Sequence, residues 1–192
     1  MNSTIIGCLC GIASYNEDSL VLSYNMIDFC NTPILVIGTK SVRIAGNYIS
    51  NRSNSYNIEE YTQECVIILG GVVTPNDIVI SDNTIVGHVD DVSNIKIQNG
   101  VCNIIISNNV ISFVRKHGIE FDGEESSGSS IHIDGNIFTT QDSNLESYIY
   151  SKTGLNIHTI IRFNSASIGT PKLASLNSGR GNAKYYSNSG YY

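Results

Sequence analysis

A ten-residue pattern recurs five times in this chain without gaps, and its seventh residue is always asparagine. These asparagines are Asn25, Asn47, Asn83, Asn109 and Asn136. The residues five and three positions before each asparagine, and two positions after it, are apolar in every copy. Most successive copies are twenty-odd residues apart, and the interval between Asn47 and Asn83 is longer. A period of this length is typical of solenoid proteins, in which each repeat forms one coil.

The apolar positions of the pattern predict strands that bury one face. The first two lie two residues apart, so they point to the same side of a β-strand. The inward-facing residues are expected to be Leu20, Leu22, Ile27, Val42, Ile44, Ile49, Ile78, Ile80, Ile85, Ile104, Ile106, Ile111, Ile131, Ile133 and Phe138. Asparagine tolerates the left-handed backbone conformation and can hydrogen-bond to the local backbone, so it suits a bend between two strands. If coils stack about 4.8 Å apart, equivalent asparagines would also form a hydrogen-bonded ladder. A weaker sixth copy is expected at Asn164.

Each coil also carries a second apolar segment, which precedes the repeated pattern. These segments predict strands at 34–37, 66–69, 95–97, 119–121 and 148–150. The composition agrees, because 29 Ile and 22 Asn against 5 Ala and 9 Leu favours strands joined by polar turns over helices. The chain is therefore expected to be all-β.

The phrases IKIQNGVCNIIISNNVIS and IEFDGEESSGSSIHIDGNIF resemble right-handed parallel β-helix proteins of the pectate-lyase-like superfamily. That superfamily includes pectinases and the tailspike depolymerases of bacteriophages. The resemblance covers Ser19 to Phe138 and, more loosely, Ser3 to Ala166. It implies a right-handed parallel β-helix, a single-stranded solenoid of about five to six coils. The fold alone does not fix a function, since it carries lyases, hydrolases, isomerases and adhesins.

The organisation expected along the chain is a single solenoid followed by a tail. Residues 1–166 form the coils, residues 50–64 form an inserted loop, and residues 167–192 form a polar tail that is irregular or ordered by oligomerisation. Because solenoids need covered ends and no cap is visible, we expect a homotrimer subunit or part of a larger chain. No secretory signal is visible, and the expected location is a virion or the extracellular space.

The charge and the hydrophobic patterning of the chain exclude two classes of partner. There are 11 Lys and Arg against 17 Asp and Glu, with no basic run, so nucleic acid is not expected as a partner. No apolar stretch reaches the roughly 20 residues that a membrane span needs, so no membrane insertion is expected. The resemblance to pectinases and tailspike depolymerases implies a polysaccharide as the partner.

The clearest candidate for chemistry is a pair of acids on the strand GIEFDG. Ile119 and Phe121 should point inward, which leaves Glu120 and Asp122 outward and roughly 6.6–7 Å apart along the strand. Inverting glycosidases hold their acid and base about 6.5–9.5 Å apart. Glu120 and Asp122 are therefore the candidate catalytic residues, and the alternative is a solvated surface pair.

The neighbouring coils would add sugar-binding groups to this pair if they stack in register. The preceding strand would present Lys96 and Gln98, and the following strand Tyr148 and Tyr150. Sugar rings stack on aromatic side chains while hydroxyls bond to polar groups, so these four residues are the candidate substrate-binding set.

Other polar residues suggest weaker alternatives. The cluster of Arg115, Lys116 and His117 could neutralise an acidic sugar, or be solvated surface. Asp90 and Asp91 are the only hint of the Ca²⁺ that a lyase would need, and no other cofactor is expected. No metal site is predicted, since His132 and His158 lack ligand spacing and the pair Cys8 and Cys10 has no second pair nearby. The five cysteines are expected to be free thiols, four of them among apolar strand residues.

Three functions remain open on the sequence alone. The first is binding and depolymerising a bacterial surface polysaccharide as part of a tailspike-like β-helix protein. The second is a non-catalytic structural or adhesive solenoid, for which the acids are surface residues. The third is a polysaccharide lyase of the pectate-lyase type.

Overall fold

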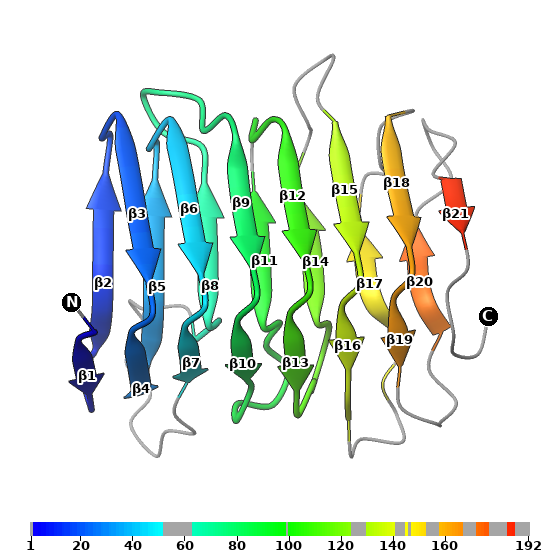
Figure 1. Ribbon diagram of the computed structural model, residues 1–192, viewed down its shortest axis with the longest axis horizontal. Coiled ribbons are helices and arrows are strands. Elements are labelled where there is room, and N and C mark those ends of the chain that lie inside the picture. Colours follow the sequence, from blue (N-terminus) through cyan, green and yellow to red (C-terminus); the bar gives the residue numbers. More distant parts are fainter. Residues whose placement is uncertain are drawn as a thin grey trace.

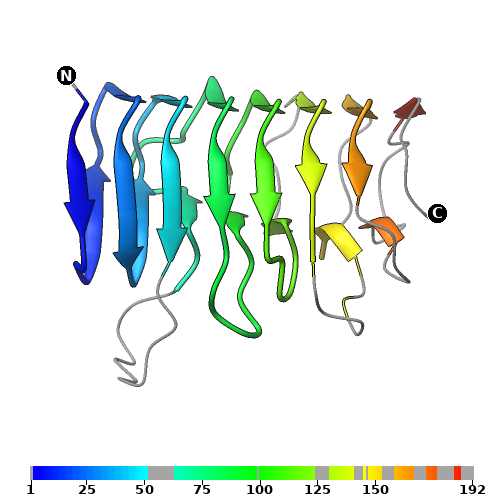
Figure 2. The ribbon, with the colours of Figure 1, turned by 60° about the horizontal axis from the view of Figure 1, so that its bottom comes forward.

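The chain forms a solenoid built from strands. The computed structural model describes residues 2–51, 63–98, 100–123, 130–140, 145, 147–152 and 158–166, and the backbone of two further strands at 172–176 and 184–186. These residues contain no helix, and so nothing helical that could cross a membrane. The coils follow one another in chain order along the long axis, with β1 at one end and β21 at the other (Figure 1; Figure 2).

Three sheets of seven strands each run the length of the solenoid, and all their pairings are parallel. We name each sheet after its first strand. The β1 sheet comprises β1 (Thr4–Ile6), β4 (Met26–Cys30), β7 (Tyr48–Asn51), β10 (Thr84–Val86), β13 (Val110–Ser112), β16 (Ile137–Phe138) and β19 (Ser165–Ala166). The β2 sheet comprises β2 (Cys10–Tyr15), β5 (Thr32–Ile37), β8 (Val66–Leu69), β11 (Ile95–Gln98), β14 (Ile119–Asp122), β17 (Ser147–Ser151) and β20 (Lys172–Leu176). The β3 sheet comprises β3 (Ser19–Ser23), β6 (Ser41–Ala45), β9 (Ile78–Ser81), β12 (Ile104–Ser107), β15 (Ile131–Asp134), β18 (Thr159–Arg162) and β21 (Lys184–Tyr186).

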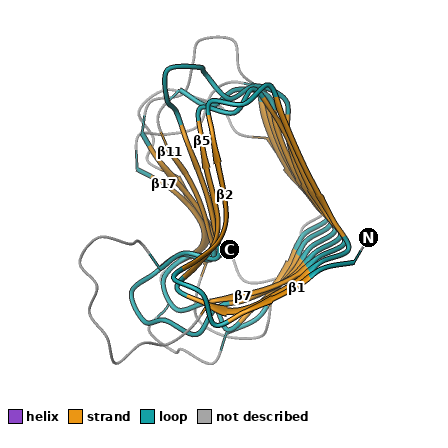
Figure 3. Ribbon diagram, turned by 90° about the vertical axis from the view of Figure 1, so that its left-hand side faces the viewer, coloured by secondary structure: helices purple, strands orange, loops and turns teal. Residues whose placement is uncertain are grey.

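The chain visits the three sheets in turn and then starts the next coil, as the end-on view shows (Figure 3). This is a right-handed parallel β-helix, and the predicted fold class is confirmed. The predicted strands before the repeated pattern belong to the β2 sheet, and the repeated pattern itself supplies the other two sheets.

The core is a column of aliphatic side chains enclosed by the three sheets. Of the residues predicted to face inward, all are buried except Leu20 and Leu22, which are partly buried and pack against the core from the first coil. The side chains of these strands point alternately into the core and into solvent. Ile104 and Ile106 are buried, whereas Ile105 between them is exposed.

The asparagines form the predicted ladder at the corner between the β3 and β1 sheets. The side-chain oxygen of each rung accepts hydrogen bonds from the backbone N–H and the side-chain amide of the preceding rung, at 2.8–3.1 Å. The ladder runs from Asn25 to Asn164, so the weaker sixth copy takes part in it. Because Asn47, Asn83, Asn109, Asn136 and Asn164 are buried, these bonds satisfy polar groups that water does not reach.

The left-handed residue at this corner differs from the prediction. It is the residue before each ladder asparagine that has a positive φ, and the asparagine itself does not. These residues are Tyr24, Gly46, Asp82, Asn108, Gly135 and Phe163, with φ between 55° and 67°. The asparagine is held by its ladder bonds, so the reversal of the chain falls on the neighbouring residue, whatever its type.

Two segments were predicted to lie outside the regular coils, the tail at 167–192 and the inserted loop at 50–64. Part of the predicted tail, residues 167–192, continues the solenoid, because β20 pairs with β17 and β21 pairs with β18. The predicted inserted loop at 50–64 begins inside β7, and residues 52–62 lie outside the described part of the chain.

Candidate functional site

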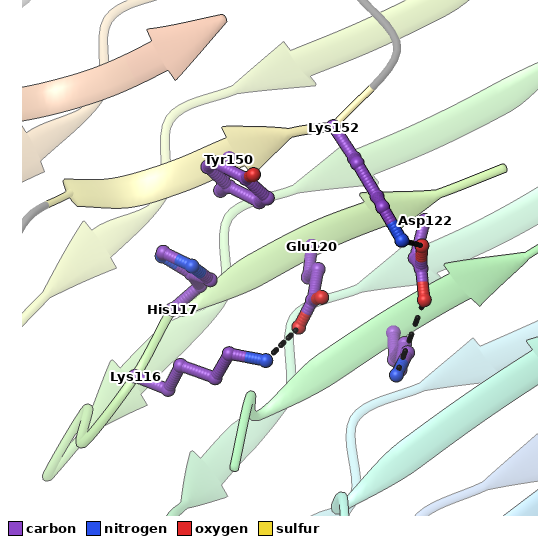
Figure 4. A pocket seen from close by; sticks show the side chains of 7 residues that line it. Lys116, His117, Glu120, Asp122, Tyr150 and Lys152 are labelled. Carbon is purple, nitrogen blue, oxygen red and sulfur yellow. Dashed lines mark hydrogen bonds and ion pairs between the residues drawn. The ribbon is translucent and has the colours of Figure 1, made fainter. Parts of the chain in front are cut away.

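The candidate site lies on the outer face of the β2 sheet, where β11, β14 and β17 stack. Lys96 pairs in register with Glu120, and Gln98 with Asp122, as the sequence predicted. Tyr150 of β17 pairs with Glu120 on the other side. These residues surround a hollow of about 320 Å³, lined by Lys96, Lys116, His117, Glu120, Asp122, Tyr150 and Lys152 (Figure 4).

Tyr148 is not part of this face, and its predicted outward orientation is wrong. The side chain is fully buried and packs against Phe138, with 5.5 Å between ring centroids. Gly118 makes room for this arrangement, since a Cβ there would approach a ring carbon of Phe138 to 2.7 Å and the carbonyl oxygen of Tyr148 to 3.1 Å. The alternation of buried and exposed side chains does not hold at the beginning of β17, where Tyr148 and Ile149 are both buried. The side chain that reaches Asp122 from this coil is instead Lys152.

Glu120 is held from two sides on this face although it is almost buried, with 5% of the residue exposed. Its Oε2 accepts a hydrogen bond from the hydroxyl of Ser93. The Nζ of Lys116 lies 3.4 Å from the same oxygen. Ser93 comes from the turn before β11 and Lys116 from the turn before β14, so two coils fix one carboxylate. This carboxylate is rigidly positioned at the floor of the hollow.

Asp122 is more exposed and is surrounded by donors. Gln98 Nε2 donates to its Oδ2 at 2.9 Å, and Lys152 Nζ donates to its Oδ1 at 3.3 Å. Lys96 Nζ lies 3.5 Å from Oδ2. Partial burial alone would raise the pKa of Asp122, but the hydrogen bonds from Gln98 and Lys152 and the charges of Lys96 and Lys152 outweigh it and lower that pKa. Asp122 is therefore a carboxylate at neutral pH.

An ion-pair chain extends this arrangement along the solenoid. Lys96 Nζ also lies 3.6 Å from Oε1 of Glu64, a buried residue before β8. The other oxygen of Glu64 is buried and has no hydrogen-bond partner among the residues that the structure describes. Charges thus alternate from Glu64 through Lys96 and Asp122 to Lys152, and opposite charges lie next to each other at every step.

An aromatic pair forms another wall of the hollow. The rings of His117 and Tyr150 stack, with centroids 4.4 Å apart and planes 7° from parallel. His117 is buried and its Nδ1 lies 3.1 Å from the carbonyl oxygen of Ser147. A ring nitrogen that contacts a carbonyl oxygen donates its proton there, so Nδ1 carries the hydrogen of this imidazole. The contact fixes the imidazole, which in turn supports the more exposed Tyr150 ring.

The other polar residues singled out in the sequence lie away from this hollow or contact one another. Of the basic cluster, Lys116 and His117 line the hollow, whereas Arg115 pairs with Asp90 at 3.6 Å. Asp91 is exposed. His132 pairs in register with Ile105 and Ile160 within the β3 sheet, away from the β2 face. Among the described residues, no three His, Cys, Asp or Glu side chains come together in a way that could hold a metal ion.

Sequence reasoning found most of this face and missed three of its members. Ser93 and Glu64 gave no signal, because each reaches its partner from a neighbouring coil through a turn of variable length. Lys152 could have been found, since placing Tyr150 opposite Glu120 places Lys152 opposite Asp122. Comparison of the chain with family models, with curated proteins and with solved structures found no match.

Proposed function

We propose that the outer face of the β2 sheet binds a polysaccharide and that Glu120 and Asp122 hydrolyse it in the hollow between β11 and β17. The observation that carries this proposal is the hollow itself, which brings two acids, three lysines, a histidine and a tyrosine together on one solenoid face. A volume of about 320 Å³ is within the range of ligand pockets.

The proposed roles follow from the surroundings of the two acids. Asp122 has a lowered pKa and would act as the base that takes a proton from the attacking water. Glu120, which accepts a hydrogen bond from Ser93 and pairs with Lys116, would take up a proton before it acts as the acid that protonates the leaving oxygen of the glycosidic bond. Residues i and i+2 lie on the same face of a strand with Cα atoms about 6.6–7 Å apart, and an inverting reaction requires carboxyl groups about 6.5–9.5 Å apart.

The binding role rests on the groups around the acids. Tyr150 offers a ring face held in place by His117, on which a sugar can stack. Lys96, Lys152 and Gln98 offer donors to sugar hydroxyls or carboxylates at the same level. Tyr148 has no place in this binding surface because it is buried.

The proposal is tested with Glu120→Gln and Asp122→Asn on a panel of bacterial capsular and O-antigen polysaccharides. We expect the unaltered chain to release reducing ends from at least one of them, and each variant to bind that glycan without releasing products. Asp134→Asn is the matched control, because Asp134 is also an aspartate paired to a basic residue, Arg162, but lies on the β3 sheet. Full cleavage by either site variant would overturn the assignment, and products with unsaturated sugars would indicate elimination instead of hydrolysis.

The second candidate function is a structural or adhesive solenoid without catalysis. It is favoured by the ion pairs, since both acids already have lysine partners within 3.5 Å, an arrangement that also serves to neutralise a stacked sheet. Glycan binding without product in the unaltered chain, reduced by Tyr150→Ala, would support this alternative.

The setting that fits the first function is a tailspike-like trimer on a virion or outside the cell, acting on a bacterial surface. This setting is part of the proposal. Light scattering at several concentrations tests it, because a stable trimer supports it and a monomer argues against it.

A further inference from the structure

Three of the five free cysteines gather at the N-terminal edge of the solenoid, and two of them lie directly across from each other. Cys10 pairs in register with Thr32, and the N–H of Thr32 donates to the carbonyl of Leu9 at 3.0 Å. One residue earlier, the N–H of Asn31 donates to the carbonyl of Cys8 at 3.0 Å. Counting back two residues from Cys10 and Thr32 puts Cys30, the last residue of β4, opposite Cys8, which lies in the turn between β1 and β2.

The two side chains also face the same way. Cys30 is fully buried in the aliphatic core, and Cys8 packs against that core from its edge. The Cys30 thiol lies close enough to Cys8 for that residue to influence its pKa. Neighbouring strands lie about 4.7–4.9 Å apart, and disulfides join Cα atoms about 4.4–6.8 Å apart. The backbone therefore already has the spacing that a bridge requires.

We propose that Cys8 and Cys30 form a redox-controlled disulfide by exchange with a small-molecule disulfide such as oxidised glutathione. The segment from Cys8 to Cys30 comprises β2, β3 and β4, one full coil in which β2 and β3 are edge strands and β4 lies next to the edge strand β1. The bridge would join the beginning and the end of this coil and close it into a covalent ring.

The exchange proceeds in two balanced steps. The Cys8 thiolate attacks one sulfur of oxidised glutathione, the S–S bond breaks, and one glutathione leaves as a thiolate that takes up a proton. The Cys30 thiol then loses its proton and attacks Cys8 sulfur in this mixed disulfide, which releases the second glutathione. The two protein thiols lose two electrons and two protons, and oxidised glutathione becomes two molecules of reduced glutathione.

The order of attack follows from accessibility. Cys8 is partly exposed and can meet a reagent in solution, whereas Cys30 is buried and its pKa is raised by burial. Cys10 lies two residues further along and faces Thr32 in the register, so it is out of line with Cys30. Cys65 is fully buried in another coil, where burial raises the pKa of its thiol to about 12.

The test is made on the unaltered full chain, purified with reduced thiols and then incubated with oxidised glutathione. Remaining thiols are alkylated and the peptides are mapped by mass spectrometry. We expect a cross-linked pair containing Cys8 and Cys30, lighter by two hydrogens, and alkylation of Cys10, Cys65 and Cys102. Amide hydrogen exchange in β3 should be slower in the oxidised protein than in the reduced protein.

Two variants make the assignment specific. Cys8→Ser should abolish the cross-link and leave exchange in β3 insensitive to oxidised glutathione, whereas Cys102→Ser should change neither result. A bridge between Cys8 and Cys10, or no cross-link in a protein whose circular dichroism shows the native fold, would overturn the proposal.

Discussion

The asparagine ladder makes a quantitative prediction at Asn109, which lies in its middle. Its side-chain amide donates to the carbonyl of Ile80 and to Oδ1 of Asn136, both at 2.9 Å. Its Oδ1 accepts from the backbone N–H and the side-chain amide of Asn83, both at 3.0 Å. Asn109→Ala removes all of these bonds and leaves the N–H of Asn83 buried without an acceptor.

The expected cost follows from these bonds. A buried hydrogen bond contributes roughly 1 kcal/mol net, and a buried group left without a partner costs about 1–3 kcal/mol. Asn109→Ala removes the four side-chain hydrogen bonds named above, so at roughly 1 kcal/mol for each bond we expect it to lower the free energy of unfolding by about 4 kcal/mol. Equilibrium urea unfolding, followed by far-ultraviolet circular dichroism, measures this loss.

Asn25→Ala is the matched control because it removes the same atoms at the edge of the ladder. The Asn25 side chain donates to Asn47 Oδ1 and accepts from the backbone N–H of Ser3, and it is only partly buried. Water can replace the lost partners there, so the expected cost is about 1 kcal/mol. Equal losses in the two variants would refute the argument that the ladder stabilises the fold by satisfying buried polar groups.

Two further predictions concern the β2 sheet. Tyr148→Ala should destabilise the fold by about 3–5 kcal/mol because it empties a buried site, whereas Tyr150→Ala on the exposed side should cost much less; thermal unfolding of both variants measures the difference. Asp122 has a pKa below its ordinary 3.8 in the folded protein, so its ion pairs stabilise the fold above that value and lose this effect as the pH falls through the lowered pKa. Asp122→Asn should therefore lower the free energy of unfolding at neutral pH, and this cost should shrink as the pH falls below 3.8 through the lowered pKa; a cost that does not change with pH would contradict this reasoning.

The fold could be predicted because its rule is local and repeated. Alternating apolar residues identify the buried face of each strand, and the asparagine marks the same corner in every copy, so one coil confirms the next. The prediction failed where a copy departs from the rule. The tail has no asparagine with the full apolar pattern around it, yet β20 and β21 extend two sheets, because pairing of backbone groups along an exposed edge needs no particular side chain.

The site could be predicted only in part, because its positions depend on register between coils. Register brought Lys96 and Gln98 beside Glu120 and Asp122, which the shared alternation of two similar strands makes predictable. On the next coil the same reasoning named Tyr148 in place of Lys152. The Phe138 ring lies against Gly118, where a Cβ would meet it at 2.7 Å, and the Tyr148 ring packs on Phe138. This packing depends on residues of two neighbouring coils, so the local sequence of β17 does not reveal it.

The left-handed position before each ladder asparagine has a consequence for the surface of the solenoid. Its occupants are as different as Tyr24, Gly46, Asp82 and Phe163, and the backbone has nearly the same φ at all of them. The larger side chains there point into solvent, with 68% of Tyr24 and 57% of Phe163 exposed. The side chains at this corner therefore form a regular row on the surface, with one side chain per coil and about 4.8 Å between neighbouring positions. Substitutions at these positions would place chosen side chains at a regular spacing along the solenoid, because the asparagine ladder beneath them holds the backbone in place.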